Sequence, residues 1–96
     1  MNVLIVFAHP ERASFNGAMA DVACDTLRAA GHTVELSDLY RMRFDPVHDR
    51  RNFSTVADAA HFKPQLEEQY ASAHDGFAAG LKAEQDKLLA ADLLIF

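Results

Sequence analysis

The sequence has 96 residues, of which 50% are apolar and 24% are charged, a composition typical of one small globular domain. Its formal net charge of −5 argues against a nucleic-acid-binding protein, which needs a basic face. The single cysteine, Cys24, excludes an internal disulfide and suits a reducing compartment. We see neither a leader pattern nor an apolar run of membrane-spanning length, so we expect a cytoplasmic protein.

The amino-terminal part of the chain follows the pattern strand, helix, strand. Val3–Phe7 is fully apolar and predicts a buried strand. A helix is expected from about Phe15 to Ala30, with Ser14 as its N-cap and Gly31 just beyond its end. Thr33–Ser37 alternates between polar and apolar residues and predicts a second strand. A strand, a helix and a strand in this order predict a right-handed crossover and a parallel pair.

One face of the predicted helix carries apolar residues at helical spacing, and we expect that face to pack on the sheet. Its members are Phe15, Met19, Ala23, Leu27 and Ala30. Cys24 lies on the flank of this helix without a histidine or a cation at helical spacing, which argues against a reactive thiol.

The pattern weakens between Asp38 and about Gly76, where we expect turns and one short helix over roughly Gln65–Ser72. A connection of this length is usually a functional or partner-facing segment. Beyond it, a helical stripe returns, and Asp92–Phe96 predicts a third strand that is buried on both faces. The stripe consists of Phe77, Leu81 and Leu88.

The loop Ala8–Ser14 follows the first strand and precedes the first helix. In an open α/β sheet this loop faces the ligand crevice, and the free N–H groups of the helix start favour an anion there. A helix start acts locally, so the net negative charge of the chain does not exclude an anionic cofactor. The loop lacks the glycines of a Walker A or GxGxxG motif, and neither an ATP site nor a Rossmann-type NAD site is supported.

The third strand ends where its own ligand-facing loop would begin. In the strand order 2-1-3-4-5 the ligand crevice lies between strands one and three. A chain that ends here would also leave the third strand as an apolar, unpaired edge of the sheet. We therefore expect residues 1–96 to be the N-terminal part of a single doubly wound α/β domain, with three strands in the order 2-1-3 and the C-terminal part absent.

Four segments, in order and with similar spacing, resemble the flavin-dependent NAD(P)H:quinone oxidoreductases, which have a flavodoxin-like fold. They are LIVFAHPERASFN (4–16), GHTVELSDLY (31–40), FDPVHDRRNF (44–53) and AEQDKLLAADLLIF (83–96). The resemblance implies two-electron reduction of a quinone by hydride transfer from NAD(P)H, with FAD as the cofactor and FMN as the alternative. It also implies a homodimer and no membrane-embedded part.

The resemblance also implies which residues hold the cofactor. It places His9, Ser14, Phe15 and Asn16 at the flavin phosphate, and Gln65 at the flavin from the long crossover, although an ungapped alignment offers Lys63 instead. It assigns no catalytic residue and no metal ligand within the chain. The chain would thus hold the phosphate half of a flavin site.

Alternatives remain open for several of these residues. Phe15 heads the apolar stripe and is equally a core residue, and Asn16 is equally a local cap. Arg12 is a candidate phosphate ligand or a partner of the neighbouring Glu11. A cluster of Asp45, His48 and Asp49 has metal-ligating residue types, but a surface turn is the favoured interpretation.

Two alternatives to an enzyme remain. The chain is also compatible with a flavin- or nucleotide-binding ancillary subunit that regulates a membrane transport system, with the long crossover as its docking surface. The third reading is an incomplete, non-functional fragment. Turnover is expected of the enzyme, flavin binding with weak turnover of the regulatory subunit, and uncooperative unfolding of the fragment.

Overall fold

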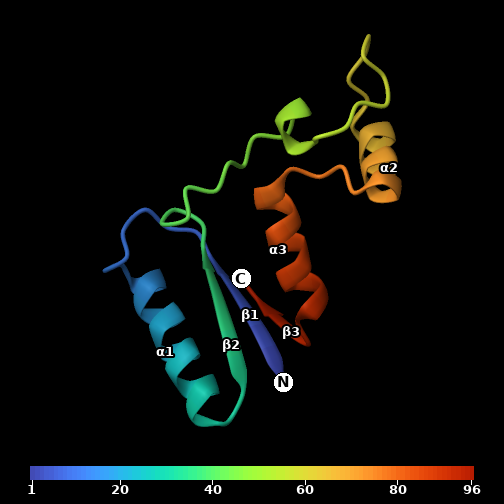
Figure 1. Ribbon diagram of the computed structural model, residues 1–96. Coiled ribbons are helices and arrows are strands. Elements are labelled where there is room, and N and C mark those ends of the chain that lie inside the picture. Colours follow the sequence, from blue (N-terminus) through green and yellow to red (C-terminus); the bar gives the residue numbers. More distant parts are fainter. The chain divides into compact units, whose positions relative to one another are not determined.

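The computed structural model describes all residues from Met1 to Phe96. Its elements are β1 (Asn2–Phe7), α1 (Phe15–Ala29), β2 (Thr33–Asp38), the short 3₁₀ helix η1 (Arg50–Asn52), α2 (Pro64–His74), α3 (Ala79–Ala90) and β3 (Leu93–Ile95). The chain forms two compact units (Figure 1). The first unit comprises Met1–Phe44 and Glu84–Phe96, and the second comprises Asp45–Ala83.

A three-stranded parallel sheet forms the centre of the first unit. Its strand order is β2-β1-β3, with β1 between the other two strands (Figure 1). Val3 lies opposite Val34 on β2 and opposite Leu93 on β3. The order and the parallel pairing confirm the predicted first three strands of a doubly wound sheet.

Helix α1 packs on one face of the sheet through small side chains. Those buried are Gly17, Ala20 and Cys24. The predicted core face is correct for Ala23 and Leu27, which pack partly buried against Val3 and Ile5. It is wrong for Phe15 and Met19, which are 79% and 56% exposed. The small residues one position further round the helix allow a closer approach to the loop and the strand, which turns these two larger side chains outward.

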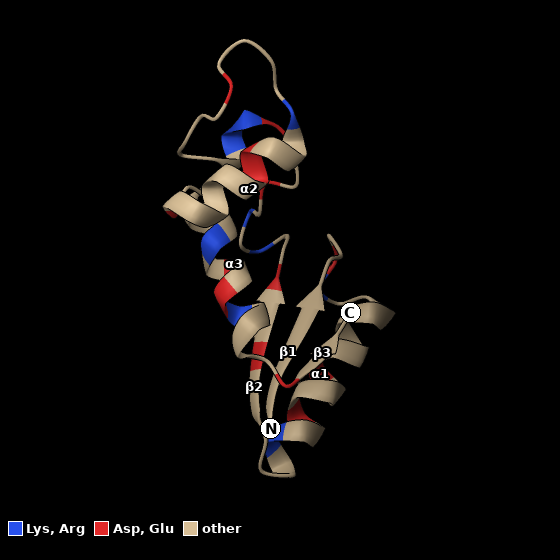
Figure 2. Ribbon diagram, turned by 90° about the vertical axis from the view of Figure 1, so that its right-hand side faces the viewer, with Lys and Arg blue, Asp and Glu red and all other residues tan.

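Helix α3 makes polar contacts with the face of the sheet opposite to α1. Side chains of that face alternate along each strand with those that face α1. Ser37 is fully buried, and its hydroxyl donates a 2.7 Å hydrogen bond to Glu84 on α3. Lys87 pairs with Glu84 at 2.7 Å and reaches the Ser37 hydroxyl oxygen at 3.3 Å. Leu88, a member of the predicted helical stripe, is 50% exposed. Along α3 the charged positions run basic, acidic, acidic, basic, as Lys82, Glu84, Asp86 and Lys87 (Figure 2).

The second unit has its own core, where the sequence predicts only turns and one short helix. That helix is confirmed as α2, which begins at Pro64. The carboxylate of Glu67 is buried and accepts the N–H groups of Ala57 at 2.9 Å and Asp58 at 3.1 Å. Arg50 pairs with it at 3.4 Å. Three aromatic rings lie beside this network, and the centroid of one is about 6 Å from the centroids of the other two. They belong to Phe53, Phe62 and Phe77.

None of the helices has both the length and the apolar character needed to cross a bilayer.

Candidate functional site

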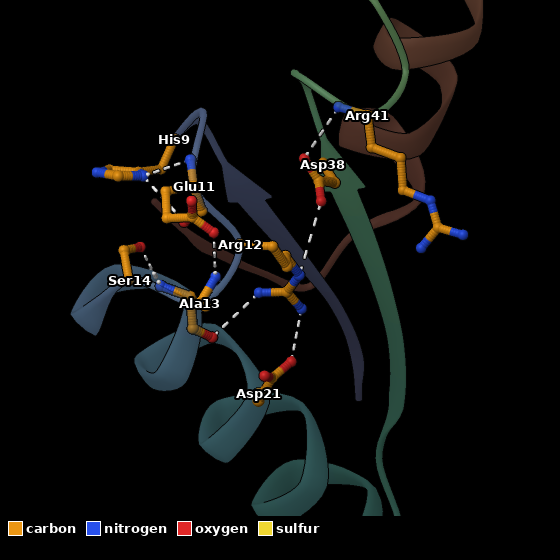
Figure 3. A network of polar contacts seen from close by, with 9 residues as sticks. His9, Glu11, Arg12, Ala13, Ser14, Asp21, Asp38 and Arg41 are labelled. Carbon is orange, nitrogen blue, oxygen red and sulfur yellow. Dashed lines mark hydrogen bonds and ion pairs between the residues drawn. The ribbon is translucent and has the colours of Figure 1, made fainter.

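The loop between β1 and α1 is ordered by hydrogen bonds within itself (Figure 3). The Glu11 carboxylate accepts the N–H of Ala13 at 3.1 Å, and the Glu11 carbonyl accepts the N–H of Ser14 at 3.2 Å. Bonds of this kind hold the loop as a compact turn at the carboxyl end of β1. The loop therefore presents a defined backbone surface at the edge of the sheet where ligands bind in open α/β folds.

The start of α1 leaves two backbone donors unpaired. Ser14 has extended backbone angles, and its hydroxyl oxygen accepts the N–H of Gly17 at 3.1 Å, which confirms the predicted N-cap. The N–H groups of Phe15 and Asn16 have no acceptor within the chain. Unpaired N–H groups at the positive end of a helix dipole favour a phosphate or carboxylate. The Ser14 hydroxyl keeps its own proton as a further donor.

The contacts of His9 Nδ1 decide whether Nε2 can present an N–H to an anion. Its Nδ1 lies 2.9 Å from the Glu11 nitrogen and 3.0 Å from the Glu11 carbonyl oxygen. In the neutral tautomer whose Nδ1 accepts the Glu11 N–H, the proton is on Nε2; in the other neutral tautomer, Nδ1 donates to the Glu11 carbonyl and Nε2 is an acceptor. In the charged ring, Nδ1 donates to the Glu11 carbonyl, and Nε2 again carries a proton. Nε2 is therefore a donor in the charged ring and in the neutral tautomer whose Nδ1 accepts from Glu11, and both forms suit an anion.

Phe15 and Asn16 both have exposed side chains. The alternative that Phe15 is a core residue is wrong, because its ring is 79% exposed. The ring and the Asn16 amide are accessible to a ligand at the start of α1.

Arg12 lies in neither of the arrangements that its sequence context suggests. Its guanidinium forms ion pairs with Asp21 at 2.5 Å and with Asp38 at 3.7 Å, and it donates to the Gly17 carbonyl at 3.1 Å (Figure 3). It also lies over the Phe7 ring, 4.9 Å from the centroid. Its charge is balanced within the protein and not directed outward at an anion. Both acidic partners are distant in sequence, so no local pattern indicates them.

Gly17 allows the loop to pass directly over the first turn of α1. A Cβ atom at this position would lie 1.9 Å from the carbonyl oxygen of Arg12, well inside van der Waals contact. Gly17 is buried, and the atom that it faces belongs to the backbone. The position of the loop relative to the helix start thus depends on the absence of a side chain here.

Gln65, the predicted flavin contact from the crossover, lies in the first turn of α2 and is exposed. Lys63, the residue offered by an ungapped alignment, precedes the helix and lies 3.9 Å from the Asp58 carboxylate. Both residues belong to the second unit. Their predicted contact with a cofactor remains a prediction.

The two acidic residues around η1 share one partner, and the histidine between them has another. Asp45 and Asp49 both pair with Arg51, at 3.2 Å and 3.0 Å, whereas His48 lies 3.4 Å from Glu68. The pKa of Asp45 lies below its ordinary value. The main cause is the hydrogen bond from the Val47 N–H, and the hydrogen bond from Arg51 lowers it further. Nowhere in the chain do three or more histidine, cysteine or acidic side chains lie together in a way that could hold a metal ion.

Comparison with known proteins defines the class to which this fold and this loop belong. The model of the family described as having a flavodoxin-like fold matches residues 1–96, and the chain belongs to that family. It is 42% identical to NAD(P)H dehydrogenase [quinone] 1 of Rattus norvegicus, over 97% of the chain and 34% of that protein. It is 40% identical to ribosyldihydronicotinamide dehydrogenase [quinone] of Homo sapiens, over 98% of the chain and 41% of that protein.

A solved structure is similar throughout the chain. A crystal structure from Klebsiella pneumoniae, described as a "putative quinone reductase", superimposes with a TM-score of 0.94 at 41% identity and covers all of this chain and 37% of that one. These matches confirm the resemblance to the quinone oxidoreductases. The chain spans about a third to two fifths of the length of these relatives.

Proposed function

We propose that the chain is the flavin phosphate-binding part of an NAD(P)H:quinone oxidoreductase. The observation that carries this proposal is the loop after β1, where His9 Nε2 and the free N–H groups of Phe15 and Asn16 are available to an anion. The quinone dehydrogenases that match the chain along its length point to a flavin as the bearer of that anion.

The donors of this loop fit a phosphate group. Each unpaired N–H group takes one phosphate oxygen, and the Ser14 hydroxyl and His9 Nε2 supply further hydrogen bonds without a net charge. The exposed Phe15 ring offers an apolar surface beside them. We propose Gln65 as a further contact of the flavin. When bound, the flavin accepts hydride from NAD(P)H and passes two electrons to a quinone, while the protein binds and orients the reactants.

The remaining features of the proposal follow the relatives. We propose FAD as the cofactor, FMN being the alternative, and a cytoplasmic homodimer that acts on small molecules and binds no nucleic acid. We also propose that residues 1–96 are the N-terminal part of one flavodoxin-like domain, because the matched relatives are more than twice as long.

The test uses the natural full-length protein. It is purified, freed of any bound flavin and titrated separately with FAD and FMN, with flavin fluorescence as the readout. The loaded protein is then assayed for oxidation of NADH and NADPH with and without a water-soluble quinone. We expect flavin binding and quinone-dependent oxidation. A protein that cannot be loaded with either flavin contradicts the proposal, and one that binds flavin without turnover favours a regulatory binding module.

A further inference from the structure

Asp38 is a buried carboxylate beside a site proposed for an anion. It ends β2, pairs in register with Phe7 at the end of β1, and is 9% exposed. Electrostatics alone would disfavour a negative charge at this edge of the sheet, and burying one is costly unless it is paired. The surroundings of this carboxylate explain its position.

The two oxygens of Asp38 connect two neighbouring loops. Oδ2 pairs with the Nε of Arg12 in the loop after β1, at 3.7 Å, and Oδ1 accepts the backbone N–H of Arg41 after β2, at 3.2 Å (Figure 3). The N–H of Leu39 donates to the carbonyl of Phe7 at 2.9 Å and fixes the same edge. Asp38 therefore ties the candidate anion loop to the end of the adjacent strand.

Arg12 extends this connection to the first helix. Its guanidinium reaches Asp38 on β2, the Phe7 ring on β1, and both the Gly17 carbonyl and the Asp21 carboxylate on α1. One planar group thus fixes the loop against all three elements that surround it. A lysine, with a single ammonium group, has no matching fork of donors.

We propose that Arg12 and Asp38 are a positioning pair for the phosphate group of the flavin, and that neither contacts the flavin. The pair holds the loop 8–14 so that the donors at His9, Phe15 and Asn16 converge on one anion. This inference rests on the proposed function. The inference also predicts that removal of the Asp38 charge weakens FMN binding. Without the pair, the loss of a negative charge near an anion should strengthen that binding.

The experiment measures the affinity of the natural full-length protein for FMN and for riboflavin, which lacks the phosphate, by fluorescence titration. Asp38→Asn is nearly isosteric and keeps an oxygen for the Arg41 N–H, but loses the ion pair with Arg12. We expect about tenfold weaker FMN binding and an unchanged affinity for riboflavin. Glu35→Gln, an exposed position on the same strand, removes the same charge and should change neither affinity by more than about twofold.

Two further variants separate positioning from direct contact. Arg12→Lys keeps the charge but not the fork, and we expect about the same loss of FMN binding as for Asp38→Asn. In the double variant Arg12→Lys with Asp38→Asn the two losses should not add, because either change alone breaks the connection. Additive losses contradict the pair.

The inference is overturned if Asp38→Asn binds FMN as tightly as the wild type or more tightly. It is also overturned if the variant loses as much affinity for riboflavin as for FMN. If the wild type binds neither FMN nor FAD, the proposed function itself fails. Thermal unfolding followed by circular dichroism shows that each variant is folded at the titration temperature.

Discussion

Gly17→Ala tests directly whether the loop after β1 must lie against α1. The added methyl group would be 1.9 Å from the Arg12 carbonyl oxygen and 2.8 Å from the Arg12 carbonyl carbon, so the loop or the helix must move by more than 1 Å to restore ordinary contact. In a helix, alanine is otherwise favoured over glycine by about 1 kcal/mol. Overpacking of a buried position costs about 1–3 kcal/mol, and we expect a net loss of up to about 2 kcal/mol in the free energy of unfolding.

The same substitution should also weaken binding. A displaced Arg12 carbonyl moves the loop that carries His9 relative to the N–H groups of Phe15 and Asn16, so the donors no longer meet one phosphate. We expect Gly17→Ala to weaken FMN binding by at least about tenfold, because the loss of one hydrogen bond to a charged group costs about 1.5–3 kcal/mol and each 1.4 kcal/mol is tenfold in affinity.

The assay combines urea unfolding, followed by circular dichroism, with FMN titration of the natural full-length protein. Gly80→Ala is the matched control, since it makes the same exchange in α3 where no atom lies within 4 Å of the new Cβ. That control should be neutral or stabilising by up to about 1 kcal/mol and should bind FMN normally. If Gly17→Ala is as stable as Gly80→Ala and binds FMN like the wild type, the close approach at Gly17 does not position the loop.

Three further substitutions test other parts of the structure. His9→Gln keeps an N–H donor in place of Nε2 and should retain most of the FMN affinity. His9→Asn has a shorter side chain, which replaces Nδ1 as the acceptor for the Glu11 N–H but not the Nε2 donor, and it should bind FMN about five- to tenfold more weakly by fluorescence titration. Ser14→Ala removes the cap and should cost about 1 kcal/mol in urea unfolding, whereas Ser14→Asp should preserve stability but lose FMN binding through charge repulsion. The backbone N–H of Ala57 is the main cause of the lowered pKa of Glu67. Its stabilisation is therefore complete above its ordinary pKa and is lost as the pH falls through the lowered pKa. The melting temperature of the wild type should fall between roughly pH 5 and pH 3, and that of Glu67→Gln should start lower and change less; equal slopes would contradict this account.

The sequence predicts the elements that depend on local chemistry. The apolar run of β1, the cap at Ser14 and the positive φ at Gly31 each follow from short-range rules, and the structure confirms all three. The strand order follows from the alternation of strand and helix combined with the resemblance.

The face that α1 buries could not be predicted in the same way. The helix carries two stripes, a large apolar one at Phe15 and Met19 and a small one at Gly17 and Ala20. Periodicity counts large apolar residues most heavily and selects the wrong stripe at the amino end. The deciding contact is the passage of the loop over Gly17, and this depends on how the loop folds back.

The partners of Arg12 and the core of the second unit were missed for a related reason. Asp21 and Asp38 lie nine and 26 residues beyond Arg12, and Glu67 binds backbone N–H groups nine and ten residues before it. Such contacts leave no short-range pattern, because an acidic residue is expected from its type alone to be exposed to solvent.

The balance of charge at the loop bears on how an acidic chain would bind the anion that we propose. The one cation of the loop, Arg12, is paired with two carboxylates, so no free positive side chain is needed at the helix start. Attraction then comes from N–H groups and the helix dipole, which act over the length of a hydrogen bond. A loop of this kind would bind a phosphate group through hydrogen bonds whose geometry the backbone sets. Its performance therefore depends on the residues that fix its backbone, Gly17, Arg12 and Asp38, as much as on those that touch the ligand.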